Sequence, residues 1–499
     1  MGSAGFADIR SQVCGNDWGW VRELKKYLSI VLILFATGSF AEVRKPAVAG
    51  SFYPANKEEL SYQINKFLNK VPSPEEKGDL IALIVPHAGY PYSGQVAAYA
   101  YKCLEGRSFD RVILLGASHH QSFDTIALPD YDYFETPLGK VKVDGDFIQK
   151  MKKLSDKIVI DNAPHREEHS FEVQLPFLQM MLKDFKIVPV LFGNISLSNC
   201  QSLAYVLSYL MEYGDLIIAS SDLSHYYPYD LAVRLDNKGI DSIVKNDLEG
   251  YVKNLAEGET EACGVPAIIT TMLLAPALGA NRFELLKYVN SGDVTGDKTK
   301  VVGYASIIFS HKEIALSEAD KKKLLRIARE TLQSYFAKKK MPEFKVAEES
   351  LKENRGAFVT LTANGRLRGC IGYIQPIKPL YLAVQEMAIE AAAKDTRFPH
   401  VTKTELKKIE IEISALSRLK RVRDISEIEI GRDGLYIIKG ENSGLLLPQV
   451  AVEWGWGREE FLDQVCVKAG LPEDSWKEKD AILYRFTAEV FREYLPQRH

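Results

Sequence analysis

Cysteine is scarce in this sequence, and the few cysteines form no recognisable pattern. Six of the 499 residues are cysteines, and no two of them are spaced as CxxC or CxxxCxxC. This absence excludes an obvious iron–sulfur or zinc-ribbon site, and nothing indicates a dense disulfide framework. Low-complexity tracts and internal repeats are absent too, which argues against a repeat architecture. A globular chain of this length is too long to fold around a single hydrophobic core, so we expect two or three domains.

A strong excess of one charge is also missing. The formal net charge is −3, although residues 321–499 carry 32 Lys and Arg against 26 Asp and Glu, so the rest of the chain is acidic. This asymmetry suggests two separate units. The surplus in the C-terminal part is too small to indicate nucleic-acid binding, and we expect none.

The N-terminal apolar run, residues 28–37, is shorter than the roughly 20 residues that a transmembrane helix needs. Basic residues precede it between positions 22 and 26, and the small residues Ser39 and Ala41 follow it. This order predicts a secretory signal peptide over residues 1–41, with an over-extended start in its first half. We therefore expect an exported, periplasmic or extracellular protein that begins near Glu42 and keeps no stable membrane span after processing. The alternative is a cytoplasmic protein whose N-terminal helix packs on the first domain.

Short aliphatic runs alternate with helical stretches between residues 42 and 312. The runs are apolar on both faces, which is typical of strands covered by helices on each side. We therefore predict an α/β domain over residues 42–312, a layered sheet with helices on both faces. The predicted strands are residues 80–86, 111–117, 186–193, 215–221 and 301–309.

A different pattern begins after residue 312. Ser317 and Asp320 resemble a helix N-cap followed by an amphipathic helix, so residues 313–323 read as a linker and helix start. Residues 324–499 then contain two strands around an Asn364-Gly365 turn, a long Ala-rich helix and the alternating strand "KKIEIEISAL". These features predict a separate α+β domain.

Histidines follow three of the predicted strands directly. His87 follows the first, His119 and His120 follow the second, and Asp222 and His225 follow a third. Ligands of open α/β sheets bind outside the carboxyl ends of the strands. One histidine there is usually a hydrogen-bonded turn residue, but three such strand ends favour a shared site.

Cys263 precedes an apolar helix whose first turn contains Gly264 and Pro266. A helix N-terminus lowers the pKa of a thiol, so Cys263 is a candidate metal ligand or nucleophile. The alternative is a buried cysteine that only caps the helix.

The segment "HREEH", residues 165–169, matches a zinc-peptidase pattern in which Glu168 would be the base. The alternative is that this segment opens a helix towards the predicted crevice. Glu168, His169 and Glu172 would then support the ligands without binding the metal themselves.

Six motifs occur in order over residues 43–311 and together resemble the Memo family, also called AmmeMemoRadiSam system protein B. They are "AGSFYP", "PHAGYPYSG", "GASHH", "EEHSFEVQLPFLQ", "SSDLSHY" and "ACGVPAI". The resemblance implies a LigB-like fold, that of class III extradiol non-haem iron dioxygenases. It also implies that His87, His119 and Cys263 are metal ligands, with Asp222 and His225 lining the same pocket.

The implied ligand set departs from the usual facial triad of two histidines and one carboxylate. A thiolate in the third position suits iron, copper or zinc, and it places ring-cleaving activity in doubt. We expect iron or copper as the cofactor, with zinc less favoured. We expect a metal-binding, redox-active protein of unknown substrate in which Asp222 and His225 transfer protons. His120 would be a hydrogen-bonded neighbour of His119. The alternatives are a non-catalytic scaffold that binds a small molecule or peptide and, less favoured, a zinc-dependent peptidase.

The C-terminal part resembles the AMMECR family, system protein A, over residues 324–496. The motifs are "LRGCIGYI", "KDTRFPHV" and "WGWGREEFLDQVCVKAGLP". The motif residues Arg368, Gly369, Cys370 and Gly372 imply tight backbone geometry at a strand, and Arg366, Arg368 and Arg397 are candidates for binding an anion. The alternative is a glycine-kinked core strand with a buried Cys370. The resemblance supplies no reaction, but it implies a separate radical-SAM partner.

Overall fold

The computed structural model describes residues 41–73, 78–194 and 196–493. The predicted signal peptide lies outside the described residues except for its last position. Among the residues that are described, no helix is both long and apolar enough to cross a membrane. The predicted domain limits, 42–312 and 324–499, stay predictions.

Four adjacent parallel strands form the centre of the first part. Their order is β8 (Lys186–Phe192), β3 (Arg111–Ala117), β9 (Asp215–Ser220) and β2 (Asp79–Val85). Nearly every residue in them is buried, because their side chains are aliphatic on both faces and helices cover both faces. The predicted strands at these positions are confirmed.

Further strands extend this sheet on both sides. Next to β2, the antiparallel β12 (Val301–His311) pairs with β10 (His225–Tyr227) and β11 (Arg282–Asn290). Next to β8 the sheet continues through β6, β5 and β1, with β4 and β7 at the side. These last strands are β6 (Gly139–Val143), β5 (Tyr133–Thr136), β1 (Val43–Arg44), β4 (Ile126–Leu128) and β7 (Ile158–Ile160).

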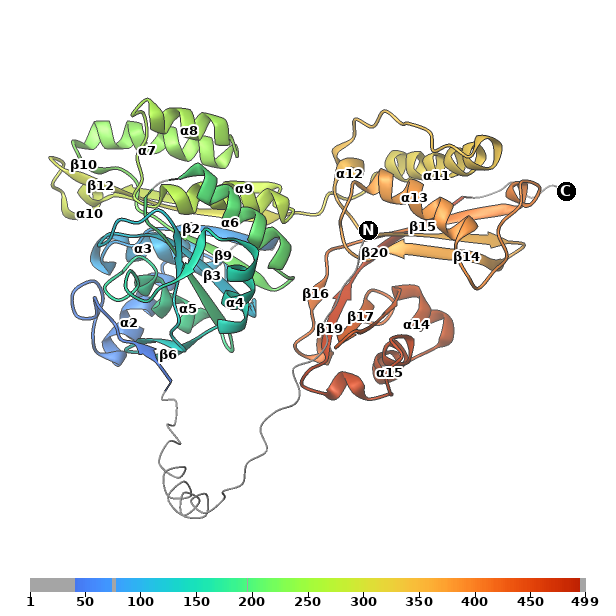
Figure 1. The fold of residues 1–499 in the computed structure, drawn as a ribbon, viewed down its shortest axis with the longest axis horizontal. Coiled ribbons are helices and arrows are strands. Elements are labelled where there is room, and N and C mark those ends of the chain that lie inside the picture. Colours follow the sequence, from blue (N-terminus) through green and yellow to red (C-terminus); the bar gives the residue numbers. More distant parts are fainter. Residues whose placement is uncertain (1–40, 74–77, 195, 494–499) are drawn as a thin grey trace, which may run out of the picture. The chain divides into compact units, whose positions relative to one another are not determined.

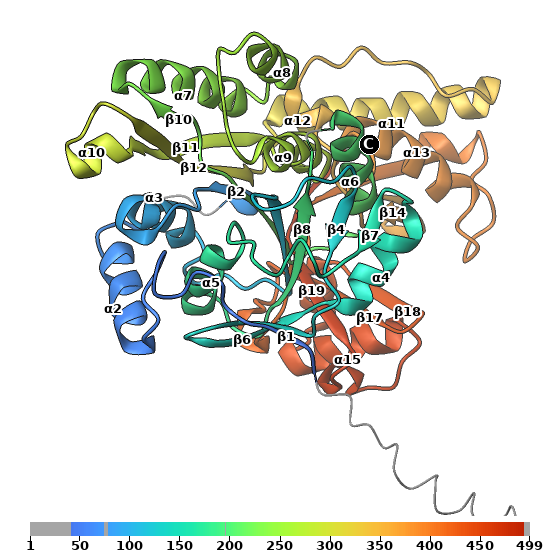
Figure 2. The same ribbon diagram turned by 60° about the vertical axis from the view of Figure 1, so that its left-hand side comes forward.

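Helices cover both faces of the sheet, as Figures 1 and 2 show. On one face α3 packs on β2 and β12, with α2 and α5 beside it. On the other face α9 packs on β2, β3 and β9, with α6 and α4 beyond it. The layered α/β fold is therefore confirmed. The helices are α2 (Lys57–Leu68), α3 (Tyr90–Lys102), α4 (Gly145–Leu154), α5 (Leu175–Met181), α6 (Leu197–Leu210), α7 (Tyr229–Val244), α8 (Leu248–Ala256), α9 (Val265–Ala277) and α10 (Ser291–Thr295).

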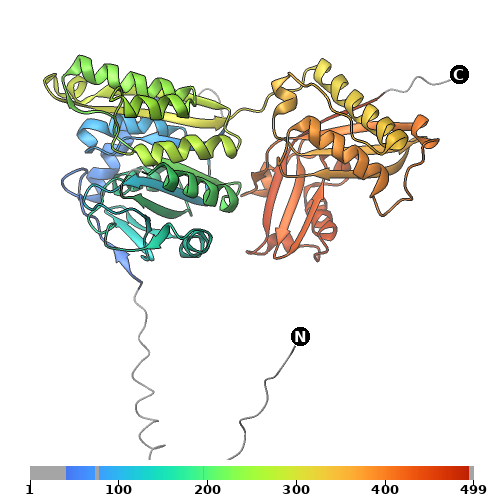
Figure 3. The same ribbon diagram turned by 45° about the horizontal axis from the view of Figure 1, so that its top comes forward.

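The second part begins with α11 (Glu318–Lys338), which starts at the predicted Ser317 cap. A four-stranded antiparallel sheet of order β14-β13-β15-β20 follows, and α11 and α13 (Leu380–Ala393) pack on it (Figure 3). Asn364 and Gly365 have φ angles of 53° and 72°, the left-handed values of the predicted hairpin turn. The strands are β13 (Ala357–Ala363), β14 (Arg366–Tyr373), β15 (Ile409–Leu416) and β20 (Ala488–Arg492).

A second antiparallel sheet of four strands has its own small core. Its order is β16-β19-β17-β18, and α15 packs its buried residues Phe461, Leu462 and Val465 on it. Both sheets are antiparallel, so the α+β class is confirmed. The elements are β16 (Lys420–Arg421), β17 (Gly434–Lys439), β18 (Asn442–Leu446), β19 (Ile482–Phe486), α12 (Glu349–Lys352), α14 (Pro448–Trp454) and α15 (Arg458–Lys468).

Candidate metal centre

Three neighbouring parallel strands deliver the predicted residues to one edge of the sheet. His87 follows β2 after Pro86, His119 follows β3 after Ser118, and Asp222 follows β9 after Ser221. The strands are adjacent in the order β3-β9-β2, so their carboxyl ends meet at the same place. Cys263 reaches this edge because it directly precedes Gly264, the N-cap of α9, and α9 packs on all three strands.

The structure brings His87, His119 and Cys263 together. One potential ligand atom from each lies within 4.8 Å of the others. The His87 Nε2 and Cys263 Sγ atoms are 3.1 Å apart, and the two imidazole rings are nearly perpendicular with centroids 4.9 Å apart. Two imidazoles and a thiol therefore converge on a volume of the size that one metal ion occupies.

The His87 imidazole is fixed through its Nδ1 atom. Ser220 Oγ lies 3.0 Å from Nδ1 and donates its own proton to the Ser170 carbonyl, so Nδ1 must be the donor to Ser220. Burial and the nearby His119 lower the pKa of His87 well below its usual value. The ring is therefore neutral, and the lone pair of Nε2 faces Cys263.

The His119 imidazole is fixed by Glu168. The Glu168 carboxylate accepts a bond from His119 Nδ1 at 2.9 Å and from the His119 backbone N–H at 2.7 Å. Although burial opposes ionisation, these bonds and one from the Ser170 N–H hold the pKa of Glu168 below its usual range. The carboxylate stays ionised and keeps the proton on Nδ1, which leaves the other ring nitrogen to bind a metal.

The cluster is deep on one side and open on the other. His87 is 2% exposed and Glu168 is fully buried, whereas 27% of the His119 side chain is exposed. A metal bound here would have access to solvent on the side of His119. An open position of this kind distinguishes a reactive or ligand-binding site from a closed structural one.

Asp222 ties three elements of the site together. Its Oδ1 accepts bonds from the backbone N–H groups of His87, at 2.7 Å, and Ala88, at 3.3 Å. Its own N–H donates to Cys263 Sγ at 3.3 Å, and its carbonyl accepts from the Cys263 N–H. Burial raises the pKa of Asp222 to about 6, although the hydrogen bond from His87 and the charge of His225 oppose this.

His225 lies beside the cluster without joining it. It is in β10, where Tyr226, with a φ of 62°, is the extra residue of a β-bulge opposite Val301 and Val302. The His225 backbone N–H donates to Glu261 at 3.2 Å, and Nδ1 is 3.7 Å from the same carboxylate. Sequence reasoning missed Glu261, whose only signal is its position on the loop that also carries Cys263.

His169 lies against the two histidines of the cluster. Its ring centroid is 4.5 Å from that of His119 and 5.4 Å from that of His87. Burial lowers the pKa of His169 to about 4, so the ring is neutral. His120 is exposed and its ring centroid lies 6.2 Å from that of His169, but the partner of His119 Nδ1 is Glu168. The expected hydrogen bond between His119 and His120 is therefore replaced by a buried carboxylate from a distant segment.

Glu172 faces away from the cluster and binds the N-terminal segment. It forms a fully buried ion pair with Arg44, a residue that sequence reasoning missed because a lone arginine in a two-residue strand carries no pattern. It also accepts hydrogen bonds from the N–H groups of Ala47 and Val48 and from Tyr53 Oη. Its predicted place beside the ligands is taken by Glu168 and His169.

The Cys263 thiol differs from expectation in one respect. It lies at the N-terminus of α9 as predicted, but burial raises its pKa, and the Asp222 carboxylate raises it further. The expected lowering of the pKa is therefore wrong, because removal from water outweighs the helix N-terminus. A cation beside the sulfur would be needed to favour the thiolate.

The "HREEH" segment is not helical. The 3-10 helix that follows begins only at Glu172. His165 is fully buried, and its Nε2 atom is 3.1 Å from the carbonyl oxygen of Ala127. The two histidines therefore do not present one helical face, which is the geometry that the zinc-peptidase interpretation requires.

The glycines of "LRGCIG" permit close packing. A Cβ atom on Gly369 would lie 2.1 Å from the carbonyl oxygen of Ala391, and one on Gly372 would lie 2.3 Å from the Phe358 ring. Cys370 is half-buried, and its Sγ accepts a hydrogen bond from Thr360 Oγ1 at 3.2 Å. These contacts agree with the interpretation as a packed strand.

The arginines near this motif are already paired. Arg368 binds Glu405 and the carbonyls of Pro399 and His400. Arg397 binds Asp395 through two nitrogens, and Asp395 also accepts the Cys370 N–H. The expected display of free cationic groups to an anion is therefore not found for Arg368 and Arg397.

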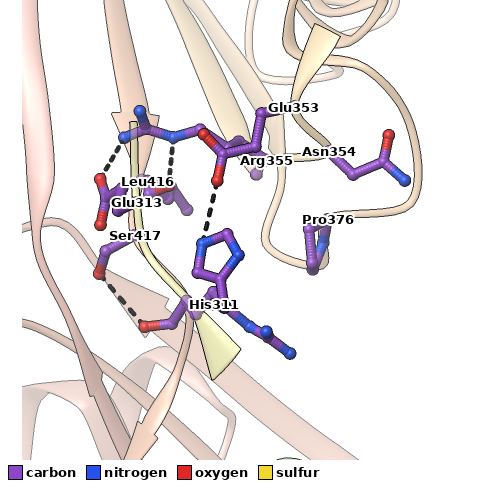
Figure 4. A pocket seen from close by; sticks show the side chains of 10 residues that line it. His311, Glu313, Glu353, Asn354, Arg355, Pro376, Leu416 and Ser417 are labelled. Carbon is purple, nitrogen blue, oxygen red and sulfur yellow. Dashed lines mark hydrogen bonds and ion pairs between the residues drawn. The ribbon is translucent and has the colours of Figure 1, made fainter. Parts of the chain in front are cut away.

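A small pocket at the end of β12 is shown in Figure 4. His311 Nε2 lies 2.9 Å from Glu353, and Arg355 binds Glu313 at 2.7 Å and the Leu416 carbonyl at 3.1 Å. His311, Glu353, Arg355 and Glu313 thus engage one another, and Arg418 donates to the Leu278 carbonyl. The residues that could hold a metal lie elsewhere, at the edge formed by β2, β3 and β9.

Comparison with known proteins matches both parts of the chain. A family described as Memo-like protein matches residues 44–308, and one described as AMMECR1 matches residues 325–491. A MEMO1 family protein of Sulfolobus acidocaldarius is 40% identical over 284 residues, which cover 54% of this chain and 99% of that protein. One of Pyrobaculum arsenaticum is 38% identical over 279 residues, with the same coverage. The crystal structure of an uncharacterised protein from Pyrococcus horikoshii is 41% identical, covers 36% of this chain and 95% of that chain, and has a TM-score of 0.36.

Proposed function

Because the chain belongs to the Memo-like protein family and carries an AMMECR1 region behind it, we propose that its first part binds a redox-active metal. His87, His119 and Cys263 would hold iron or copper. The observation that carries this proposal is that a ring nitrogen of His87, a ring nitrogen of His119 and the Cys263 sulfur lie within 4.8 Å of one another. Ser220 and Glu168 bind the Nδ1 atoms of the two histidines.

The donor set fits these metals. Imidazole suits iron and copper, and thiolate favours copper and iron over hard cations such as Mg²⁺ and Ca²⁺. Such a metal would supply one-electron or Lewis-acid chemistry to whatever binds on the open side of the site.

The protein's own residues would orient the ligand and manage protons. Asp222 is a buried carboxyl whose pKa of about 6 allows it to exchange a proton near neutrality. His225 lies beside it, half-exposed, and is suited to pass that proton to solvent. His119 borders the opening and would admit the ligand.

Metal analysis of anaerobically purified protein tests this proposal. Wild-type protein should contain about one iron or copper ion per chain, and Cys263→Ser should lose it. Cys103→Ser is the matched control, because Cys103 is a buried core cysteine at the other end of α3 from His87, where it donates to the Tyr99 carbonyl. Absence of metal from folded wild-type protein would overturn the proposal and favour a non-catalytic scaffold that binds a small molecule or peptide.

We propose in addition that the protein is exported and that its AMMECR1 region docks a partner. The signal-like segment supports the first proposal. The family resemblance supports the second, with a radical-SAM protein as the partner to test. A mature N-terminus near Glu42 would support export, whereas an intact N-terminus on native protein together with co-purification of a cytoplasmic radical-SAM protein would favour the cytoplasmic alternative.

A further inference from the structure

We propose that Arg44 is a positioning residue of the metal centre. It fixes the backbone that carries Glu168 and His169, and through the Glu168 carboxylate it aims the His119 imidazole. This inference rests on the metal site proposed above. It adds Arg44, which lies far from the proposed ligands in the sequence.

Arg44 is an arginine that is only 2% exposed, and its guanidinium is used on three sides. Nε donates to the His165 carbonyl at 3.1 Å, and Nη2 donates to the Glu168 carbonyl at 2.5 Å. The remaining nitrogen, Nη1, pairs with the Glu172 carboxylate. One side chain therefore holds three points along the segment from residue 165 to residue 172.

Glu168 connects this anchor to the metal centre. Its carbonyl is held by Arg44, while its carboxylate holds the His119 ring and backbone and accepts the N–H of His169 at 3.0 Å. The residue is thus constrained at both ends. Productive site geometry requires placement within about 0.5 Å, so a shift of the Glu168 backbone would misdirect the imidazole.

Glu172 joins a second segment, residues 47–53, to the same anchor. Its two oxygens hold the backbone of residues 47 and 48 and the Tyr53 hydroxyl. Between these points the chain carries Phe52, whose ring centroid is 4.9 Å from that of His169. The Arg44–Glu172 pair therefore links residues 47–53 to residues 165–172, and the two segments meet where Phe52 packs against His169.

A role in stability alone does not explain this arrangement. A buried ion pair contributes little net stability compared with apolar residues of the same size. Two of the three Arg44 contacts are to carbonyls of the segment that orients the ligands, which a pair serving only Glu172 would not require. The geometry points to site alignment.

Cobalt(II) binding to the full chain tests the inference, because the thiolate-to-cobalt absorption band reports the coordination of the ion. We would titrate wild type, Arg44→Met, and the double variant Arg44→Met/Glu172→Gln, which leaves no uncompensated buried carboxylate. The matched control is Arg111→Met. Arg111 pairs with Asp144 and Asp215 at the other end of β3 from His119, so its loss removes ion pairs without touching the site.

We expect the Arg44 variants to bind cobalt roughly 10–100-fold more weakly than wild type and to show an altered absorption band. Losses of this size are typical when a residue that orients a metal ligand is removed. Arg111→Met should bind as wild type does, whatever its stability. Wild-type affinity and spectrum in a folded double variant would overturn the inference while leaving the metal site standing. The proposed metal site predicts a thiolate-to-cobalt band in wild type that disappears in Cys263→Ser. If wild type shows no such band, the proposed metal site is overturned, and this inference with it.

Discussion

The candidate metal centre and the "LRGCIG" strand both contain several residues capable of chemistry, but their structures differ. In the candidate metal centre, His87 and His119 each bind a protein group through Nδ1, which would leave the second ring nitrogen for a metal. Near Cys370, the guanidinium groups of Arg368 and Arg397 already bind neighbouring carboxylates and carbonyls. A candidate site is therefore distinguished by side-chain atoms that can still bind a ligand after the neighbouring residues have formed their hydrogen bonds and ion pairs.

The largest expected effect is the difference in metal affinity between substitution of His119 and substitution of its neighbour His120. His119→Ala should weaken metal binding by more than about 100-fold, beyond the effect usual for residues behind a ligand, because it removes a ligand. His120→Ala should bind metal as wild type does, since His120 is exposed and Glu168 orients His119. Isothermal titration with cobalt(II) measures both. Equal losses in the two variants would contradict this assignment.

A smaller effect, on stability alone, is expected in the second region. Gly369→Ala should lower the free energy of unfolding by about 2–3 kcal/mol, because the new Cβ would overlap the Ala391 carbonyl. Denaturation followed by tryptophan fluorescence reports this part of the chain, where three of the five tryptophans lie. Gly457→Ala is the control, because nothing lies near its Cβ position. Loss of metal from Gly369→Ala would show that the two regions are not independent.

The smallest effect concerns acid stability. The Arg397 guanidinium, aided by the Cys370 N–H, holds the pKa of Asp395 at about 2, below the unfolded value of about 3.9. Asp395 therefore stabilises the folded state fully above about pH 4, and this contribution disappears as the pH falls towards 2. Asp395→Asn should lose it at neutral pH and show a flatter decline in the unfolding midpoint between pH 4 and 2. An unchanged decline would show that the Arg397–Asp395 pair contributes no stability.

Sequence reasoning succeeded where the signal is local. The strands β2, β3 and β9 are continuous aliphatic runs, and their ends carry the residues that meet at one edge. Cys263 was placed at a helix start because Gly264 and Pro266 mark one. The hairpin at Asn364-Gly365 was likewise readable from two residues.

It failed where an answer depends on partners far along the chain. Glu168, and not the adjacent His120, orients His119, and Glu172 serves Arg44 and the N-terminal segment instead of the ligands. The raised pKa of Cys263 follows from burial, which no local pattern reports. The "HREEH" pattern suggested a helical pair, but His165 is held in a turn by its contact with the Ala127 carbonyl.

The sequence by itself determined the strands, the fold classes, the family and the residues that reach the site, because periodicity, turn residues and strand ends act over short distances. The tertiary structure alone decided which ring nitrogens remain for a metal, which arginines are already neutralised, and which carboxylate aims which imidazole. Those properties depend on hydrogen bonds and burial between segments separated by tens to more than a hundred residues, as between Arg44 and Glu172.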